Sequence, residues 1–116
     1  MPNPVVHFEV TGTDGAKLQR FYREAFAWNI DAENPMAYGM VDNDGEGIGG
    51  GISGGEASGV TFYIEVADLG EALKKVQSLG GRVVMEITEI PDMVTMAQFA
   101  DPAGNVIGLV KAEAEG

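Results

Sequence analysis

The sequence predicts an α+β fold made of two βαβββ modules, because three features of the chain occur twice. A strand pattern leads to an aspartate in each half: Asp14 lies seven residues after His7, and Asp68 lies seven residues after Thr61. An amphipathic helical pattern follows each aspartate. The segment DNDGEGIG (42–49) shares its Asp, Gly, Ile and Gly with DPAGNVIG (101–108), which indicates a tight turn that leads into a strand.

The first module is expected to span residues 1–54. It starts with the strand VVHFEV, and Asp14 is a plausible cap for the helix that follows. Apolar residues recur in this helix at spacings of three and one, which predicts one buried stripe of Leu18, Phe21, Tyr22, Ala25 and Phe26. Short strands are predicted at 28–32, 36–42 and 46–52.

The second module is expected to span residues 58–116, with the strand VTFYIEV first. Asp68 and Glu71 have the spacing of a capping box, and Gly80-Gly81 is typical of a helix end. The apolar stripe of this helix comprises Leu69, Ala72, Leu73, Val76 and Leu79. Strands are predicted at 82–90, 93–100 and 105–111.

A glycine-rich segment, GIGGGISGGEASG (47–59), is predicted to join the modules outside the core or, as the alternative, to form a mobile rim loop, because it is rich in turn-forming residues. A chain of 116 residues is the usual length of one domain, so both modules are expected to form a single domain over 1–116.

Composition narrows the function classes. The chain has no cysteine, which excludes disulfides, zinc–thiolate sites and cysteine nucleophiles. Its net charge of −11 repels nucleic acids and anionic membranes and favours cationic ligands. No apolar run reaches the roughly 18 residues of a membrane span, and the N-terminus lacks an export signal. We therefore expect a cytoplasmic protein without nucleic-acid or membrane partners.

Alternation along the strands separates a packed face from a polar face. The rows predicted to pack against the helices are Val6, Phe8 and Val10, then Phe62, Ile64 and Val66, with Ala97 and Phe99. The opposite rows mix polar and apolar groups, as a small-molecule pocket does. They predict a ligand-binding surface of His7, Glu9, Thr61, Tyr63, Glu65, Met96 and Gln98.

These paired modules resemble the glyoxalase/bleomycin resistance/dioxygenase superfamily, also called the vicinal oxygen chelate fold. The resemblance covers nearly the whole chain and includes His7, Phe21-Tyr22, Trp28, Val66, Asp68, Leu79-Gly80-Gly81 and the segment DPAGNVI (101–107). It implies curled mixed sheets around a cleft, with the helices packed outside. In metal-dependent members, one residue on the first strand and one on the last strand of each module bind the metal.

The internal alignment places these four positions at His7, Gly49, Thr61 and Gly108. Glycine has no side chain to offer, and a threonine hydroxyl is a poor ligand beside histidine or glutamate. Glu9 and Glu65 share the face of His7, but residues i and i+2 of a strand lie about 7 Å apart, which disfavours a shared ion. We therefore predict no metal or other cofactor, unless the alignment is shifted. His7 is expected to line a pocket, with a structural role as the second interpretation.

Two function classes follow. The first is a metal-free protein that binds a small molecule, cationic or aromatic, as in the bleomycin-resistance branch. The second is an enzyme: a metal-free acid/base catalyst with His7 as the candidate catalytic residue, or a metal-dependent lyase (related to lactoylglutathione lyase) or dioxygenase of the glyoxalase type. The resemblance and the open sheet edges further predict a homodimer.

Overall fold

A computed structural model describes residues 2–91 and 94–112. The chain forms two compact units, Val6–Thr61 and Met1–Val5 with Phe62–Gly116, which we call the first and second module. The start of the chain belongs to the second module, where the Pro4 carbonyl accepts a hydrogen bond from the Glu65 N–H at 2.9 Å. That the two repeats together form one domain stays a prediction.

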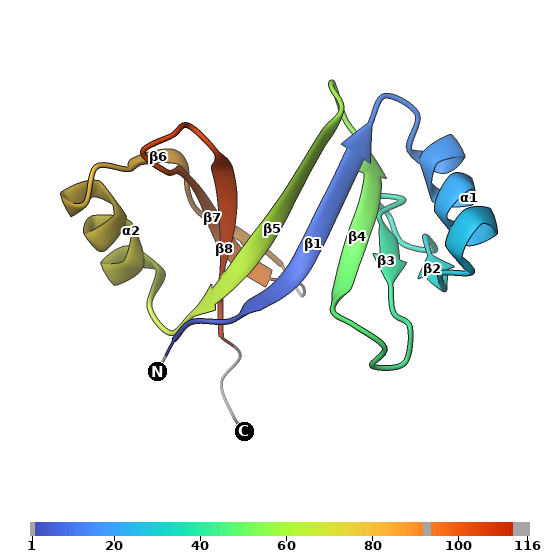
Figure 1. Cartoon of the computed structure of the whole chain (residues 1–116), viewed down its shortest axis with the longest axis horizontal. Helices are drawn as coiled ribbons and strands as arrows, with labels where there is room; N and C mark the ends of the chain where they lie inside the picture. The colour runs from blue at the N-terminus through green and yellow to red at the C-terminus, as the bar shows by residue number, and fades with distance from the viewer. Residues whose placement is uncertain (1, 92–93, 113–116) are drawn as a thin grey trace. The chain divides into compact units, whose positions relative to one another are not determined.

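The first module contains β1 (Val5–Gly12), α1 (Gly15–Phe26), β2 (Ile30–Asp31), β3 (Gly39–Val41) and β4 (Gly49–Gly54). Its strands lie in the order β2-β3-β4-β1 (Figure 1). β1 and β4 are parallel, and the other neighbours are antiparallel. Asp14 caps α1, because its carboxylate accepts a hydrogen bond from the Lys17 N–H at 3.1 Å.

The second module contains α2 (Leu69–Ser78), β6 (Arg82–Ile90), β7 (Val94–Ala100), β8 (Val106–Lys111) and most of β5 (Gly59–Val66), whose first three residues belong to the first module. Its strand order is β5-β8-β7-β6, with β5 and β8 parallel. The mixed sheets and the strand–helix–strand order of both modules confirm the predicted α+β class. The strands predicted at 82–90 and 105–111 are confirmed to within one residue, and the strand predicted at 93–100 is confirmed over Val94–Ala100, since position 93 lies outside the described residues.

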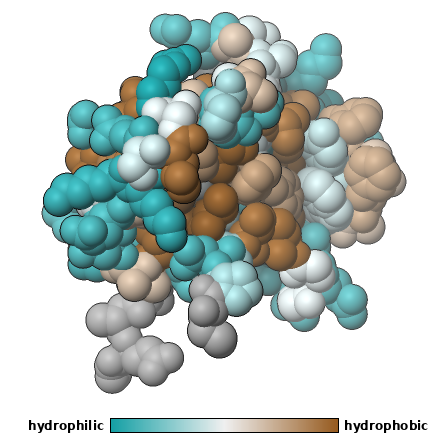
Figure 2. Space-filling model, turned by 60° about the vertical axis from the view of Figure 1, so that its left-hand side comes forward, coloured by the Kyte–Doolittle hydropathy of each residue, from teal (hydrophilic) through white to brown (hydrophobic). Residues whose placement is uncertain are grey.

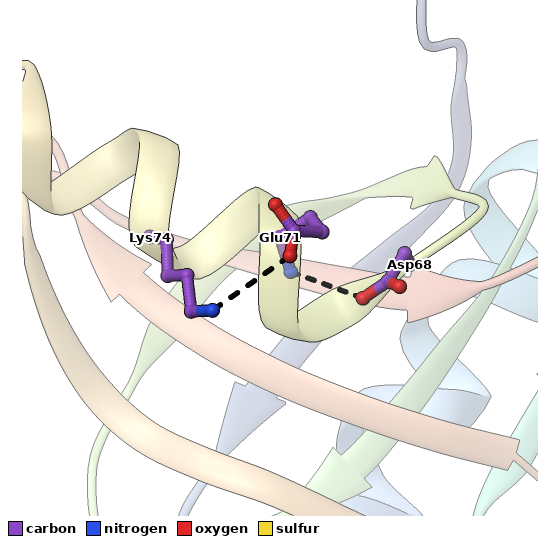
Figure 3. Close-up of polar contacts among 3 residues, drawn as sticks. All are labelled: Asp68, Glu71 and Lys74. Atoms are coloured by element: carbon purple, nitrogen blue, oxygen red, sulfur yellow. Dashed lines mark hydrogen bonds and ion pairs between the residues drawn. The ribbon is translucent and has the colours of Figure 1, made fainter.

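The start of α2 is half of the predicted capping box. The Asp68 carboxylate accepts from the Glu71 N–H at 3.0 Å, while the Glu71 carboxylate lies 3.7 Å from the Lys74 ammonium (Figure 3). Both carboxylates lie in or before the first turn, where the helix dipole favours negative charge. The helix ends as predicted, because Gly80 has a φ of +96° and the Gly81 N–H donates to the Val76 carbonyl at 2.9 Å.

Each module has its own apolar core. In the second module, Val66, Leu69, Leu73, Ala97 and Leu109 are buried together, with Ile64 and Phe99 packed against them. Phe62 belongs to the same predicted row, but 39% of its surface is exposed. In the first module, Ile30, Val41 and Ile52 form the core, and the partly buried Phe8, Val10, Leu18, Tyr22 and Trp28 pack against it.

The predicted apolar stripe of α1 is wrong in part. Phe21 and Phe26 are 56% and 61% exposed, and the buried residue of this helix is Gln19. The reason lies in the sheet beneath. A Cβ at Gly15 would overlap the backbone of Gly54, so the helix lies close to exposed strand backbone. Gln19 meets this surface, because its amide donates to the Ile52 carbonyl at 2.7 Å and to the Ala37 carbonyl at 3.1 Å.

The glycine-rich segment 47–59 is not a joint outside the core, contrary to expectation. Gly49–Gly54 form β4, which overlaps the predicted strand 46–52 and lies between β3 and β1, and Gly50, Gly51 and Ile52 are buried. These glycines make room for aromatic rings, since a Cβ at Gly50 would overlap the ring of Phe8. The predicted strands 28–32 and 36–42 shorten to β2 and β3, next to Ala27 and Ala37, which have positive φ.

Within residues 2–91 and 94–112, no helix is long and apolar enough to cross a membrane.

Replacing Gln19 by methionine is expected to lower the free energy of unfolding by about 1–3 kcal/mol, because the buried Ile52 carbonyl and the partly buried Ala37 carbonyl lose their donor. Urea denaturation followed by the fluorescence of Trp28, the only tryptophan, measures this difference. Gln77→Met on the exposed face of α2 is the matched control and should change stability by less than about 0.5 kcal/mol. Equal losses in the two variants would contradict the role of Gln19.

Candidate functional site

The candidate site lies on the face of β1 opposite the first module's core. Phe8 and Val10 pack against that core, so His7 and Glu9 point to the other face, because side chains alternate along a strand. Both polar side chains are half-buried there. This confirms the predicted separation of faces in β1.

Tyr38 joins these two residues into a hydrogen-bonded chain. Its hydroxyl lies 2.9 Å from His7 Nε2 and donates to Glu9 Oε2 at 3.0 Å. The rings of His7 and Tyr38 are nearly parallel, with centroids 6.4 Å apart. One phenol thus connects an imidazole and a carboxylate that start two positions apart on one strand. We call these three residues the polar triad.

The loop before β3 holds Tyr38 in place. Asn34 accepts a hydrogen bond from the Tyr38 N–H at 3.0 Å and donates to its carbonyl at 2.7 Å. Ala37 has a φ of 52°, a conformation that costs energy for a residue with a Cβ. Its carbonyl accepts from the buried Gln19, which ties the loop to α1. The position of the phenol therefore follows from the packing of the whole module.

A glycine beneath the ring completes this arrangement. β1 and β4 pair so that Gly49 lies opposite His7 and Gly51 lies opposite Glu9. A Cβ at Gly51 would overlap the hydroxyl end of Tyr38. The ring occupies the space that any other residue at position 51 would fill, so glycine here serves a close approach.

The environment of His7 favours its neutral form. Burial lowers the pKa of His7 below the ordinary value near 6.5, and the negative charge of Glu9 offsets only part of this effect. The lowered pKa shifts the imidazole of the folded protein towards its uncharged form. It can therefore both donate and accept a hydrogen bond, which an imidazolium cannot do.

The second module assembles the other predicted site residues on one face of its sheet. Strand pairing places Tyr63, Gly108 and Gln98 in one row, and Glu65, Val110 and Met96 in the next. Tyr63 is only 4% exposed, and its ring covers Gly108, where a Cβ would overlap it. Thr61, on the same strand as Tyr63 but at the end of the first module, is half-buried. The predicted residues thus form one group in each module, and their common cleft stays a prediction.

Residues 5–109 match the model of the Glyoxalase/Bleomycin resistance protein/Dioxygenase superfamily. This chain belongs to that superfamily. The family suggested by the sequence motifs is therefore confirmed. Among the curated proteins compared, none matches this sequence.

Solved structures with the same fold include three that cover nearly the whole chain. A hypothetical protein from Bacillus halodurans C-125 superposes with a TM-score of 0.73 at 12% identity, over 100% of this chain and 99% of that one. Methylmalonyl-CoA epimerase from Mycobacterium tuberculosis gives 0.69 at 14% identity, over 95% and 88%. A glyoxalase/bleomycin resistance protein/dioxygenase superfamily member from Vibrio splendidus 12B01 gives 0.66 at 19%, over 96% and 100%. These likenesses show the fold.

Strand register shifts the internal alignment of this superfamily member by two residues. Gly108 lies opposite Tyr63, two positions beyond Thr61, whereas Gly49 lies opposite His7. The counterpart of Gly108 is therefore Gly51. The turns themselves match, with Gly45 and Gly104 at φ of +84° and +92°, but the first module adds residues around Gly47 before its strand begins.

The donor set does not fit the metal site that metal-dependent superfamily members use. His7 Nε2 is engaged by the Tyr38 hydroxyl, and the positions opposite His7 and Glu9 on β4 are glycines. In the alignment shifted by two residues, Gly49 corresponds to Val106, whose side chain has no atom that binds a metal. In the part of the chain that the structure describes, no three residues of the types His, Cys, Asp and Glu form a group able to hold a metal ion.

Sequence reasoning missed Tyr38, which lies in a loop 31 residues from His7. The available signal was the Asn34-Pro35 dipeptide, which marks a turn just before an aromatic residue and a glycine. It indicates a loop that can present a ring. Nothing in the pattern indicates which strand residues the ring meets.

A shallow hollow on α1 lies apart from these residues in the sequence. It is open to solvent and is lined by Asp14, Ala16, Lys17, Arg20, Phe21 and Glu24. One helix face and its cap form all of it, and its charges have both signs. The polar triad is the better site, because its groups converge within hydrogen-bond distance.

The pKa of His7 is expected to lie below 6.5 and to fall further in Glu9→Gln, which removes the charge that raises it. NMR titration measures this directly, because the chain has a single histidine. Glu86→Gln, at an exposed position of β6, is the control and should leave the pKa unchanged.

The same shift predicts a pH dependence of stability. Between the lowered folded pKa and 6.5, the unfolded chain binds more protons, so the free energy of unfolding rises with pH. This contribution is complete above pH 6.5 and is lost as pH falls through the folded pKa. His7→Gln should abolish it. A folded pKa at or above 6.5 would contradict both expectations.

Proposed function

We propose that this superfamily member is a metal-free protein that binds a small molecule at the polar triad of the first module. The hydrogen-bonded chain from His7 Nε2 through the Tyr38 hydroxyl to Glu9 Oε2, at 2.9 and 3.0 Å, supports the proposal. The polar triad offers an imidazole, a phenol and a carboxylate in fixed positions, on the face of β1 opposite the apolar core. A few oriented polar groups of this kind are typical of small-molecule sites.

The charges favour a cationic or aromatic ligand. Glu9 is half-buried, and a carboxylate attracts a cation more strongly where water is partly excluded. The net charge of −11 adds a long-range attraction for cations. The nearly parallel rings of His7 and Tyr38 offer flat surfaces to an aromatic group. That Thr61, Tyr63, Glu65, Met96 and Gln98 also contact a ligand stays a prediction.

A metal-free acid/base enzyme is the second candidate. The lowered pKa of His7 favours it, because a neutral imidazole can accept a proton at neutral pH. Methylmalonyl-CoA epimerases are among the solved proteins with this fold, which makes an enzyme of the superfamily a reasonable alternative. A binder and an enzyme differ in turnover of the bound compound.

We further propose a cytoplasmic homodimer. β6 is the last strand of the second module's sheet, so one edge of this strand is unpaired within the module. Large apolar side chains reach the surface, among them Val84, Ile87 and Val94. Figure 2 shows one face of the molecule, on which brown, hydrophobic atoms lie among hydrophilic ones. Edges and apolar surfaces of this kind are commonly covered in oligomers.

Divalent metals are expected to leave the melting temperature unchanged. A metal that binds only the folded state raises stability, by about 2.7 kcal/mol at a concentration of 100 Kd. Thermal melts with Ni²⁺, Zn²⁺, Fe²⁺ or Mn²⁺, against samples with a chelator, measure this effect. A saturable rise that His7→Gln abolishes would contradict the metal-free proposal and favour the metal-dependent lyase or dioxygenase.

A screen of small cationic and aromatic compounds is expected to yield ligands that shift the NMR signals of His7. Substituting Glu9→Gln should weaken the binding of a cationic ligand by roughly tenfold, since a lost charged contact is worth about 1.5 kcal/mol. Glu86→Gln, again the control, should leave its affinity unchanged. If the affinity of the ligands is the same in the wild-type protein, His7→Gln and Glu9→Gln, the binding site lies elsewhere and the proposal is contradicted. Turnover of a ligand, lost in His7→Gln, would favour the enzyme.

A further inference from the structure

We infer that Met40 is a specificity-determining residue of the candidate site, and that the ligand carries a cation and an aromatic ring in one molecule. The cation meets the Glu9 carboxylate, and the ring lies against the Met40 thioether. This inference rests on the proposed function, because it specifies the ligand of the same site.

Strand register places Met40 on the face of the polar triad. Gly51 of β4 pairs with Glu9 of β1 on one side and with Met40 of β3 on the other. Residues that pair directly across neighbouring strands point to the same face of a sheet. Glu9, Gly51 and Met40 therefore form one cross-strand row, on the face opposite the first module's core.

The neighbours of Met40 on its own strand support this orientation. Gly39 and Val41 are buried, and Val41 belongs to the core. A Cβ at Gly39 would overlap the side chains of Gln19 and Ile30, on the core side of the strand. Met40 lies between these two residues and points to the other face, where 42% of its surface is exposed.

The row connects a carboxylate with an apolar side chain. Neighbouring strands lie about 4.8 Å apart, so the Cα atoms of Glu9 and Met40, two strands apart, are separated by about 10 Å. The hydroxyl end of Tyr38 lies over Gly51, between these two residues. A ligand that contacts both Glu9 and Met40 therefore extends across the phenol and needs a linker between its two groups.

The two ends of the row select different chemical groups. Glu9 is half-buried, and a carboxylate attracts a cation more strongly where water is partly excluded. A methionine side chain is unbranched and polarizable, and its sulfur makes favourable contacts with aromatic rings. A single exposed apolar residue needs no function. Met40 is different because its row begins at the carboxylate of the candidate site.

Asp31 is the competing carboxylate. It pairs with Met40 from the other side, on β2, and its side chain is exposed. Water and salt screen the attraction between an exposed charge and a cation. We therefore expect the cation at Glu9, and Asp31→Asn is a matched control. Asparagine retains the oxygen that accepts a hydrogen bond from the Glu33 N–H.

Three related probes separate the two contacts. They are 4-phenylbutylammonium, butylammonium without the ring, and 4-phenylbutanol without the charge. NMR titrations that follow the Met40 methyl signal, together with calorimetry, give the Kd of each probe. We expect 4-phenylbutylammonium to bind more tightly than the other two and to shift the Met40 methyl signal.

Substitutions at the two ends of the row should have different effects. Met40→Gln should weaken the binding of 4-phenylbutylammonium about threefold to tenfold and leave that of butylammonium unchanged. Leu79→Gln, at the exposed C-cap of α2, is the control and should change neither Kd. Glu9→Gln should abolish the preference for 4-phenylbutylammonium over 4-phenylbutanol, whereas Asp31→Asn should retain it. Amide spectra verify that each variant is folded.

The inference and the proposed function fail in different ways. An unchanged affinity for 4-phenylbutylammonium in Met40→Gln would overturn the inference, and so would an equal loss for butylammonium. A charge preference that is lost in Asp31→Asn but not in Glu9→Gln would overturn it as well, since the cation would then lie at the other end of the row. If none of the three probes binds, the inference is also wrong, while other cationic or aromatic compounds still test the proposed function. Binding that changes in neither His7→Gln nor Glu9→Gln would contradict the proposed function itself.

Discussion

Both modules depend on a parallel pair of strands in which glycine on the last strand makes room for an aromatic ring. Phe8 covers Gly50 on the core face of the first module, Tyr38 covers Gly51 on the opposite face, and in the second module Tyr63 covers Gly108. Any side chain at these glycines would collide with a ring. Since interiors are close-packed, such a collision forces the ring or the strand to move. The glycines thus specify where the rings lie.

This constraint also builds the polar triad. The Cα atoms of His7 and Glu9 lie roughly 7 Å apart along their strand, so a third group is needed to connect the two side chains by hydrogen bonds. The phenol over Gly51 bridges them with hydrogen bonds of 2.9 and 3.0 Å. In the second module, Tyr63 occupies the strand position that corresponds to Glu9. Its own ring is buried and covers Gly108. In both repeats an aromatic ring lies over a glycine. In the first module this ring belongs to a hydrogen-bonded chain, whereas in the second module it is a packed ring.

The two helices differ in how they pack. α2 buries Leu69 and Leu73 in an apolar core, whereas α1 packs Leu18 and Tyr22 against its apolar core and also buries Gln19, whose amide donates to the Ile52 and Ala37 carbonyls. A glycine-rich strand presents little side-chain surface, so its backbone groups must find polar partners. Through Ala37, the same glutamine also supports the loop that holds Tyr38. Gln19 therefore contributes both to the stability of the first module and to the geometry of its site.

Local patterns were sufficient for the fold class, the repeat, both helix starts and the polar and apolar faces of β1. These features depend on residues within a few positions of one another, as with Asp14 and Lys17 or Asp68 and Glu71. The absence of donor side chains at Gly49 and Gly108 was equally visible. Three features required the folded chain: β4 inside the sheet, Gln19 beneath α1, and Tyr38 between His7 and Glu9. Each of these features depends on contacts between segments that are distant in the sequence. A glycine has no side chain, so the sequence around it does not indicate which ring will cover it.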